Sequence, residues 1–142
     1  MTVRAFADTN VIVYAQSADG DKTIKAVTVL EASPVISAQV VNETIAVLTR
    51  KHGFSLADAH QVSIYLMAAC EVVPLDAGTI HGAIRLAQHY ALSHWDSLIV
   101  SAALKAGCDT LYSEDMQHGQ VFDEQLTVVN PFSELVSLSR TP

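Results

Sequence analysis

The chain is poor in features that mark several classes of protein. Its two cysteines, Cys70 and Cys108, lie far apart in apolar segments, and their spacing fits no zinc or redox motif. We therefore expect buried, reduced thiols and a cytoplasmic location. No apolar run reaches the roughly 18 residues of a membrane span. The amino terminus lacks a basic region followed by a long apolar stretch, so neither a signal peptide nor a membrane association is expected.

Basic residues are also few. The sequence has 8 Lys and Arg against 15 Asp and Glu, which gives a net charge of −7. Proteins that bind nucleic acid usually present a basic face to the phosphates. Any RNA-binding surface here is thus expected to be small, or completed by another chain. Carboxylates that belong to a metal site would account for part of the negative charge. A divalent ion bound there would reverse the local field.

Apolar residues, in contrast, make up 50% of the 142 residues, while only 16% are charged. This composition is typical of a packed protein rather than a disordered one, and the length predicts a single domain over residues 1–142. Strands are expected at the short apolar runs 3–7, 34–37, 71–75, 110–113 and 126–129. Helices are expected between them, and this alternation predicts a mostly parallel, roughly five-stranded sheet covered on both faces. Residues 116–126 are expected to form a mobile loop, and the last ten residues remain unassigned.

Helical periodicity predicts which side chains face the core. The expected core-facing residues are Ile24, Val27, Leu30, Val41, Thr44, Ile45, Leu48, Val62, Tyr65, Leu66, Ala69, Ile80, Ala83, Ile84 and Ala87. The only tryptophan, Trp95, is expected to pack against the sheet edge. Helices are expected to start at Ser55, Asp76 and Ser93, whose side chains can accept hydrogen bonds from free backbone N–H groups.

Four acidic residues stand out by their position. Asp8 follows the first expected strand, Glu43 lies in the helix after the second, and Asp96 begins the helix before the fourth. Asp115 follows that fourth strand. Parallel strands end at one edge, so Asp8 and Asp115 should arrive on the same side, where a helix that follows a strand also begins. Glu43 has apolar neighbours one turn away, and burying such a carboxylate is costly without a cation or hydrogen bonds.

Each of these residues also has a simpler interpretation. Asp8 and Asp115 could be loop or turn residues, Asp96 could complete a capping box with Ser93, and Glu43 could be solvated at a helix edge. One shared edge, however, explains all four positions. Gathered there, the carboxylates would repel one another, so a divalent ion is the expected partner. Oxygen ligands suit Mg²⁺ or Mn²⁺ rather than zinc, and such a site can bind a phosphate and activate a water.

The chain resembles the PIN domain, most closely the toxin subunit of VapBC toxin–antitoxin pairs. The resemblance covers residues 3–132 in the order of the family. The residues that carry it are Asp8-Thr9-Asn10, Asn42-Glu43, Trp95-Asp96-Ser97-Leu98-Ile99 and Ser113-Glu114-Asp115. It implies a three-layer α/β/α fold and an Mg²⁺- or Mn²⁺-dependent ribonuclease. It also implies a homodimer inhibited by a cognate antitoxin, and Ile64 and Leu66 lie in a helix that could form part of an interface.

The resemblance further implies a role for each site residue. Asp8, Glu43, Asp96 and Asp115 would be the catalytic, metal-binding carboxylates, with Glu114 as the competitor of Asp115. Thr9 or Ser113 would orient a ligand or a water. Asn10 would form a hydrogen bond near the Asp8 carboxylate.

Two other functions are compatible with parts of the pattern. A PIN-like module that binds RNA or protein without cleaving would share the fold, but it would have little use for unpaired carboxylates. An aspartate phosphotransferase or receiver domain would need a second carboxylate beside the strand-end aspartate. Ala7 and Asn10 occupy those places, which disfavours that class.

Overall fold

A twisted sheet of six strands runs through the protein, in the order β3-β2-β1-β4-β6-β5. The computed structural model describes residues 3–133, so the expected tail lies outside the described residues apart from Ser133. The strands are β1 (Ala5–Ala7), β2 (Val35–Ser37), β3 (Glu71–Val73), β4 (Thr110–Tyr112), β5 (Val121–Phe122) and β6 (Leu126–Val129). The helices are α1 (Thr9–Ala15), α2 (Gly20–Glu31), α3 (Ala38–Lys51), α4 (Leu56–Ala69), α5 (Ala77–Tyr90) and α6 (His94–Lys105).

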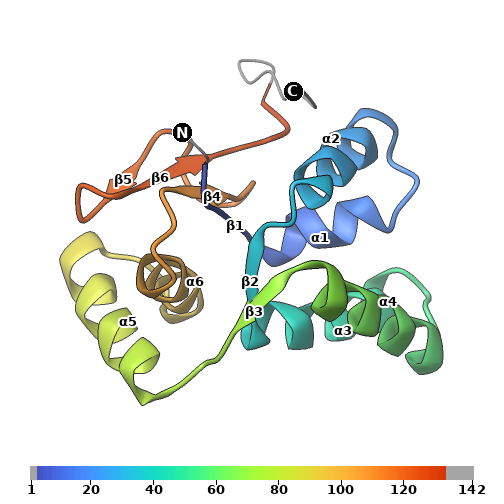
Figure 1. Ribbon diagram of the computed structural model, residues 1–142, viewed down its shortest axis with the longest axis horizontal. Helices are drawn as coiled ribbons and strands as arrows, with labels where there is room; N and C mark the ends of the chain where they lie inside the picture. Colours follow the sequence, from blue (N-terminus) through green and yellow to red (C-terminus); the bar gives the residue numbers. More distant parts are fainter. Residues whose placement is uncertain (1–2, 134–142) are drawn as a thin grey trace.

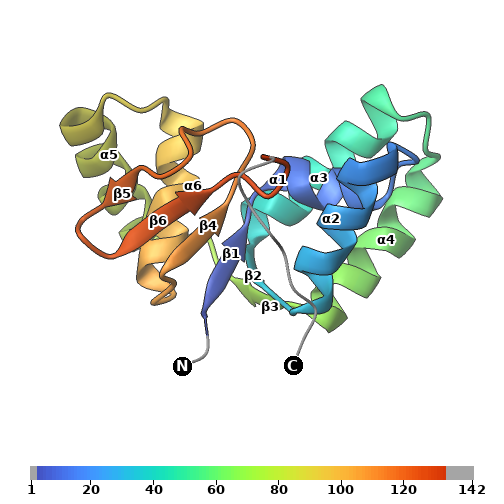
Figure 2. The same ribbon diagram turned by 90° about the horizontal axis from the view of Figure 1, so that it is seen from above.

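Helices flank the sheet on both sides. Helices α1 to α4 gather on one side, and α5 and α6 cover the other, as Figures 1 and 2 show from two directions. All strands except β5 run parallel to their neighbours. The arrangement confirms the expected α/β fold with a mostly parallel sheet.

Strand β1 lies in the middle of the parallel part, between β2 and β4. Phe6, which is fully buried, is in register with Val35 on one side and Leu111 on the other. The ladder continues past the strand end, because the Asp8 backbone N–H donates to the Tyr112 carbonyl over 3.0 Å. The residues that follow β1 and β4 are therefore neighbours, and Asp8 and Ser113 emerge side by side at the carboxyl edge.

The prediction of a mobile loop over residues 116–126 is wrong. Strand β5 lies inside this segment and pairs with β6 in antiparallel fashion, so the sheet has six strands rather than about five. Phe122 is fully buried, with its ring centroid 4.9 Å from that of Tyr90. Arg85 of α5 also forms an ion pair with Asp123 over 2.5 Å. These long-range contacts order a segment whose local sequence is polar.

Several helices present a face that differs from the predicted one. The expected core residues Ile24, Tyr65, Ile80 and Ile84 are 61%, 68%, 39% and 47% exposed, and Trp95 is 64% exposed rather than packed against the sheet edge. Neighbouring residues face the core instead, namely Ala26, Val29 and Leu86, while Ala83 is buried as predicted. Leu66 is buried as the periodicity predicted, which excludes it from an interface, whereas Ile64 is 60% exposed.

The expected helix starts are confirmed. The Ser55 and Ser93 hydroxyls accept from the backbone N–H groups of Asp58 and Asp96 over 3.0 and 3.1 Å. The Asp76 carboxylate accepts from the Thr79 N–H over 2.9 Å. Cys70 and Cys108 are free and buried, as expected. Within residues 3–133, none of the helices has the length and apolar character needed to span a membrane.

Replacing Phe122 by alanine tests whether the β5 segment is part of the core. The change should lower the free energy of unfolding by about 3–5 kcal/mol, because it leaves a cavity at a fully buried aromatic position. Urea unfolding measures the loss. The control is Val121→Ala at the neighbouring, 47% exposed position, where a change within about 0.5 kcal/mol is expected. Equal effects of the two substitutions would contradict a packed β5.

Candidate active site

Four carboxylates from distant parts of the chain line one pocket of about 130 Å³. Asp8 follows β1, Glu43 lies in α3, Asp96 is in the first turn of α6, and Asp115 follows β4. The remaining lining residues are Thr9, Asn10, Gln39, Val47, Trp95 and Ile99. The structure thus brings all four acidic residues to the carboxyl edge of the sheet, as the strand order requires.

Asp8 is the most buried of the four, with 8% of its surface exposed. Its Oδ1 accepts from the Thr9 backbone N–H over 2.7 Å, and its Oδ2 accepts from the Ser113 hydroxyl over 3.0 Å. Burial raises the pKa of Asp8 to about 6, and the charges of Asp96 and Glu43 add to this shift. The two hydrogen bonds lower the pKa but do not offset burial.

Polar neighbours fix two of the other carboxylates. The Thr9 hydroxyl and the Gln39 side-chain amide both donate to Glu43 Oε1, over 3.1 and 3.3 Å. Asn10 donates to Asp115 Oδ2 over 2.6 Å, in the pocket that Asp8 also lines. Ser113 is therefore the hydroxyl that orients Asp8, while Thr9 orients Glu43 through its side chain.

Asp96 lies at the amino terminus of α6, where the Ser93 hydroxyl accepts from its backbone N–H. Burial raises the pKa of the Asp96 carboxyl above its ordinary value, and the nearby charge of Asp115 raises it further. Because the cap uses the backbone N–H of residue 96, any non-proline residue there could form it. An aspartate is therefore not required at this position for helix capping.

Glu114 and Asp115 are adjacent in sequence but have different surroundings. Glu114 accepts from Lys22 Nζ over 2.6 Å and from the Tyr14 hydroxyl over 3.1 Å. Asp115, in contrast, lines the acidic pocket. Of the two candidates, Asp115 thus has the geometry expected of the fourth acidic residue.

The donor set of the pocket suits a hard divalent cation. The described lining residues include no Lys, Arg or His to neutralise the carboxylates. Within residues 3–133, however, no three acidic, histidine or cysteine side chains stand close enough together to form a ready ligand group. The chemistry of the oxygen donors thus fits Mg²⁺ or Mn²⁺, while the carboxylates stand apart around the pocket.

The sequence alone did not indicate Gln39, Lys22 or Tyr14. Gln39 lies four residues before Glu43 in α3, a spacing that places two side chains on the same face of a helix. That spacing could have identified Gln39. Lys22 and Tyr14 contact Glu114 across the fold, and nothing in their local sequence signals this contact.

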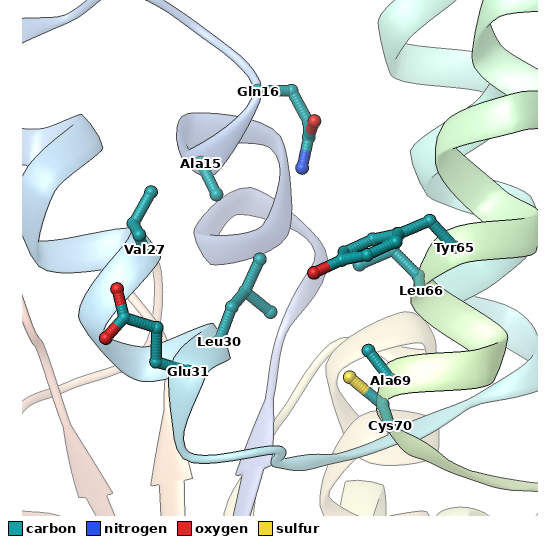
Figure 3. A pocket seen from close by; sticks show the side chains of 9 residues that line it. All are labelled: Ala15, Gln16, Val27, Leu30, Glu31, Tyr65, Leu66, Ala69 and Cys70. Atoms are coloured by element: carbon teal, nitrogen blue, oxygen red, sulfur yellow. The ribbon is translucent and has the colours of Figure 1, made fainter.

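A second pocket lies among α1, α2 and α4, away from the acidic edge (Figure 3). The Tyr65 ring extends from α4 toward Leu30 and Ala15, although most of its surface is exposed. Glu31 is the single acidic residue that lines this pocket. The cluster of carboxylates is thus a property of the pocket at the sheet edge.

The fold and the pocket define an α/β protein with an acidic site at the carboxyl edge of a parallel sheet. A family model of the PIN domain matches residues 5–121, and the chain belongs to this family. No curated protein gives a significant sequence match.

Solved structures share the fold at low sequence identity. A toxin–antitoxin complex from Klebsiella pneumoniae has a TM-score of 0.70 and 19% identity, covering 90% of this chain and 98% of that one. VapC20 from Mycobacterium tuberculosis, described as a sarcin–ricin loop cleaving toxin, has a TM-score of 0.64 and 24% identity, covering 78% and 89%. FitAcB from Neisseria gonorrhoeae has a TM-score of 0.67 and 17% identity, covering 89% and 97%.

Replacing Asp8 by asparagine should stabilise the metal-free chain at neutral pH. The pKa of Asp8 is about 6 in the folded chain against an ordinary 3.8, so between these values only the folded state keeps the proton. Stability is therefore lost as the pH rises from about 4 to about 6, and the loss is complete above that range. Asparagine cannot ionise and avoids this loss, which amounts to about 2–3 kcal/mol at most.

Urea unfolding in EDTA at pH 4 and pH 7 measures this effect. The gain should be small at pH 4 and large at pH 7. The exposed Asp21→Asn is the control and should give no such pH-dependent gain. An equal stability change of Asp8→Asn at both pH values would contradict the burial argument.

Proposed function

We propose that the protein is an Mg²⁺- or Mn²⁺-dependent endoribonuclease, the toxin of a type II toxin–antitoxin pair. The observation that carries this proposal is the convergence of Asp8, Glu43, Asp96 and Asp115 on one pocket. Membership of the PIN domain family supports it. So does the fold shared with a toxin–antitoxin complex and with a toxin described as cleaving the sarcin–ricin loop.

The four carboxylates would hold the cation, which supplies charge neutralisation at the phosphodiester and activation of the attacking water. The chain contributes orientation. The Thr9 N–H and the Ser113 hydroxyl fix Asp8, while the Thr9 hydroxyl and Gln39 fix Glu43. Asn10 holds Asp115. These donors restrain oxygens that would otherwise turn away from one another.

The cations of the chain are poorly placed to bind RNA by themselves. Within residues 3–133, four Lys and Arg side chains are engaged in ion pairs with carboxylates. The pairs are Arg4–Glu71, Lys22–Glu114, Arg85–Asp123 and Lys105–Asp76. The bound divalent ion and a second chain would therefore provide most of the positive charge that RNA requires.

We propose two protein partners, a second copy of the chain and a cognate antitoxin that regulates the acidic pocket. We also propose that residues 1–142 form a single domain and that the protein acts in the cytoplasm. Support for a homodimer comes from helix α4. Ile64 and Met67 are 60% and 47% exposed, and both line an apolar groove of about 410 Å³ between α3 and α4. Exposed apolar surface of this kind is typical of interfaces.

Replacing Asp96 by asparagine tests the nuclease proposal. Asparagine keeps the shape and the backbone N–H that caps α6, but it removes the charge. Cleavage of a mixed RNA pool with Mn²⁺ should fall by at least about 100-fold. Losing a residue that only supports the metal ligands commonly costs about 10–100-fold, and Asp96 is itself a proposed ligand. EDTA should abolish cleavage by the unchanged protein.

Asp58→Asn is the matched control. Asp58 also lies three residues after a capping serine and donates its N–H to that serine over 3.0 Å, but it is exposed on α4 and does not line the pocket. Its replacement should leave cleavage unchanged. Equal cleavage by the Asp96 variant would show that another site or a contaminant is active. The absence of both cleavage and Mn²⁺ binding in the unchanged protein would favour the alternative, a PIN-like module that does not cleave.

Replacing Ile64 by glutamate tests the homodimer. A charge on the exposed face of α4 should shift the protein toward monomer, because it would be buried without a partner in an apolar interface. Sedimentation velocity over a concentration series measures the shift. Ile24→Glu is the control, since Ile24 is equally exposed, at 61%, but lies on α2. A dimer that tolerates Ile64→Glu would exclude this surface.

A further inference from the structure

Gln39, in the first turn of α3, carries an unsatisfied buried oxygen. Its Oε1 has no hydrogen-bond partner among the described residues, and the side chain is only 7% exposed. Leaving a buried polar atom without a partner destabilises the folded chain, because the atom has lost its hydrogen bonds to water. In native proteins such groups usually contact a water, an ion or a ligand, and Gln39 lines the pocket that holds the four carboxylates.

The neighbours of Gln39 fix the orientation of its amide. Nε2 donates to Glu43 Oε1 over 3.3 Å and, at the long distance of 3.5 Å, to the Trp95 carbonyl. If the amide were turned over, Oε1 would face these two acceptors and could accept from neither. In this orientation the buried carbonyl oxygen faces neither acceptor and has no hydrogen-bond partner among the described residues.

The charge of the pocket favours a cation as that partner. Asp8, Glu43, Asp96 and Asp115 surround the same space. A fifth carboxylate would increase their repulsion, whereas an amide carbonyl adds an oxygen without adding charge. Hard divalent cations accept amide carbonyls as ligands, and Mg²⁺ keeps several waters that need acceptors.

We propose that Gln39 Oε1 is an uncharged oxygen donor to the divalent cation site, contacting the ion or a water that it carries. The inference rests on the proposed function, since it needs a cation in the acidic pocket. It assigns a second task to Gln39, which also restrains Glu43 through Nε2. One side chain would thus orient an acidic ligand and complete the oxygen set around the ion.

Calorimetric titration of the full chain with Mn²⁺, in the absence of RNA, tests this proposal. Gln39→Met keeps the length of the side chain but removes its polar atoms, and it should weaken Mn²⁺ binding by roughly tenfold or more. Gln39→Glu also loses the Nε2 donor to Glu43 but keeps an oxygen at the same place, so it should bind Mn²⁺ at least about threefold more tightly than Gln39→Met does. Gln61→Met, at an exposed position of α4, is the control and should bind as the unchanged protein does.

The outcomes separate this inference from the proposed function. If the Mn²⁺ affinity of Gln39→Met is within about twofold of that of the unchanged protein, the proposed role of Gln39 is overturned and the nuclease proposal stands. A residue that supports the metal site should cost at least about tenfold in affinity. A variant that binds Mn²⁺ normally but has a raised KM for RNA would also overturn it and assign the oxygen to the substrate. No Mn²⁺ binding by the unchanged protein overturns both proposals. If Gln39→Met does not fold, as judged by circular dichroism, Gln39→Glu decides: binding within about threefold of the unchanged protein supports the inference, and a larger loss overturns it.

Discussion

Repulsion among carboxylates is the constraint on which the candidate site depends. Asp8 is buried where Asp96 and Glu43 also raise its pKa, so the metal-free fold holds this charge at a cost. Hydrogen bonds from the Thr9 N–H and the Ser113 hydroxyl offset part of that cost and keep the carboxylate in place. A cation bound there would relieve the repulsion, so metal affinity and folding stability are coupled in the proposed enzyme.

In the turn after β4, two adjacent acidic residues differ in role, since one contacts neighbouring helices and the other lines the acidic pocket. Glu114 forms an ion pair with Lys22 and accepts a hydrogen bond from the Tyr14 hydroxyl, and the Tyr14 ring packs edge-on against Phe132, with centroids 4.9 Å apart. This cluster ties the turn to α1 and α2. The next residue, Asp115, lies in the acidic pocket and is held only by Asn10 among the hydrogen bonds of the described residues. Two adjacent acidic residues thus have opposite environments.

The sequence predicted the features that depend on local pattern, and it failed where distant contacts decide. Strand positions, helix caps and the edge shared by the four carboxylates follow from short apolar runs, capping side chains and parallel topology. The buried faces of α2 and α5 were misjudged in part, because Ala26, Val29 and Leu86 pack against the core where three isoleucines were expected. Strand β5 is ordered by Phe122 against Tyr90, and the orphaned oxygen of Gln39 becomes visible only once α3 is placed beside the amino terminus of α6.

The position of β1 between β2 and β4 determines when the acidic pocket can form during synthesis. Asp8 leaves the ribosome 105 positions before its partner Ser113. Strand β1 is flanked by β2 and β4, so its second neighbour is missing until β4 has emerged. A nascent chain therefore carries its acidic residues without the pocket that unites them. For a protein proposed to cleave RNA, the order of translation would delay activity until β4 and Asp115 have been made.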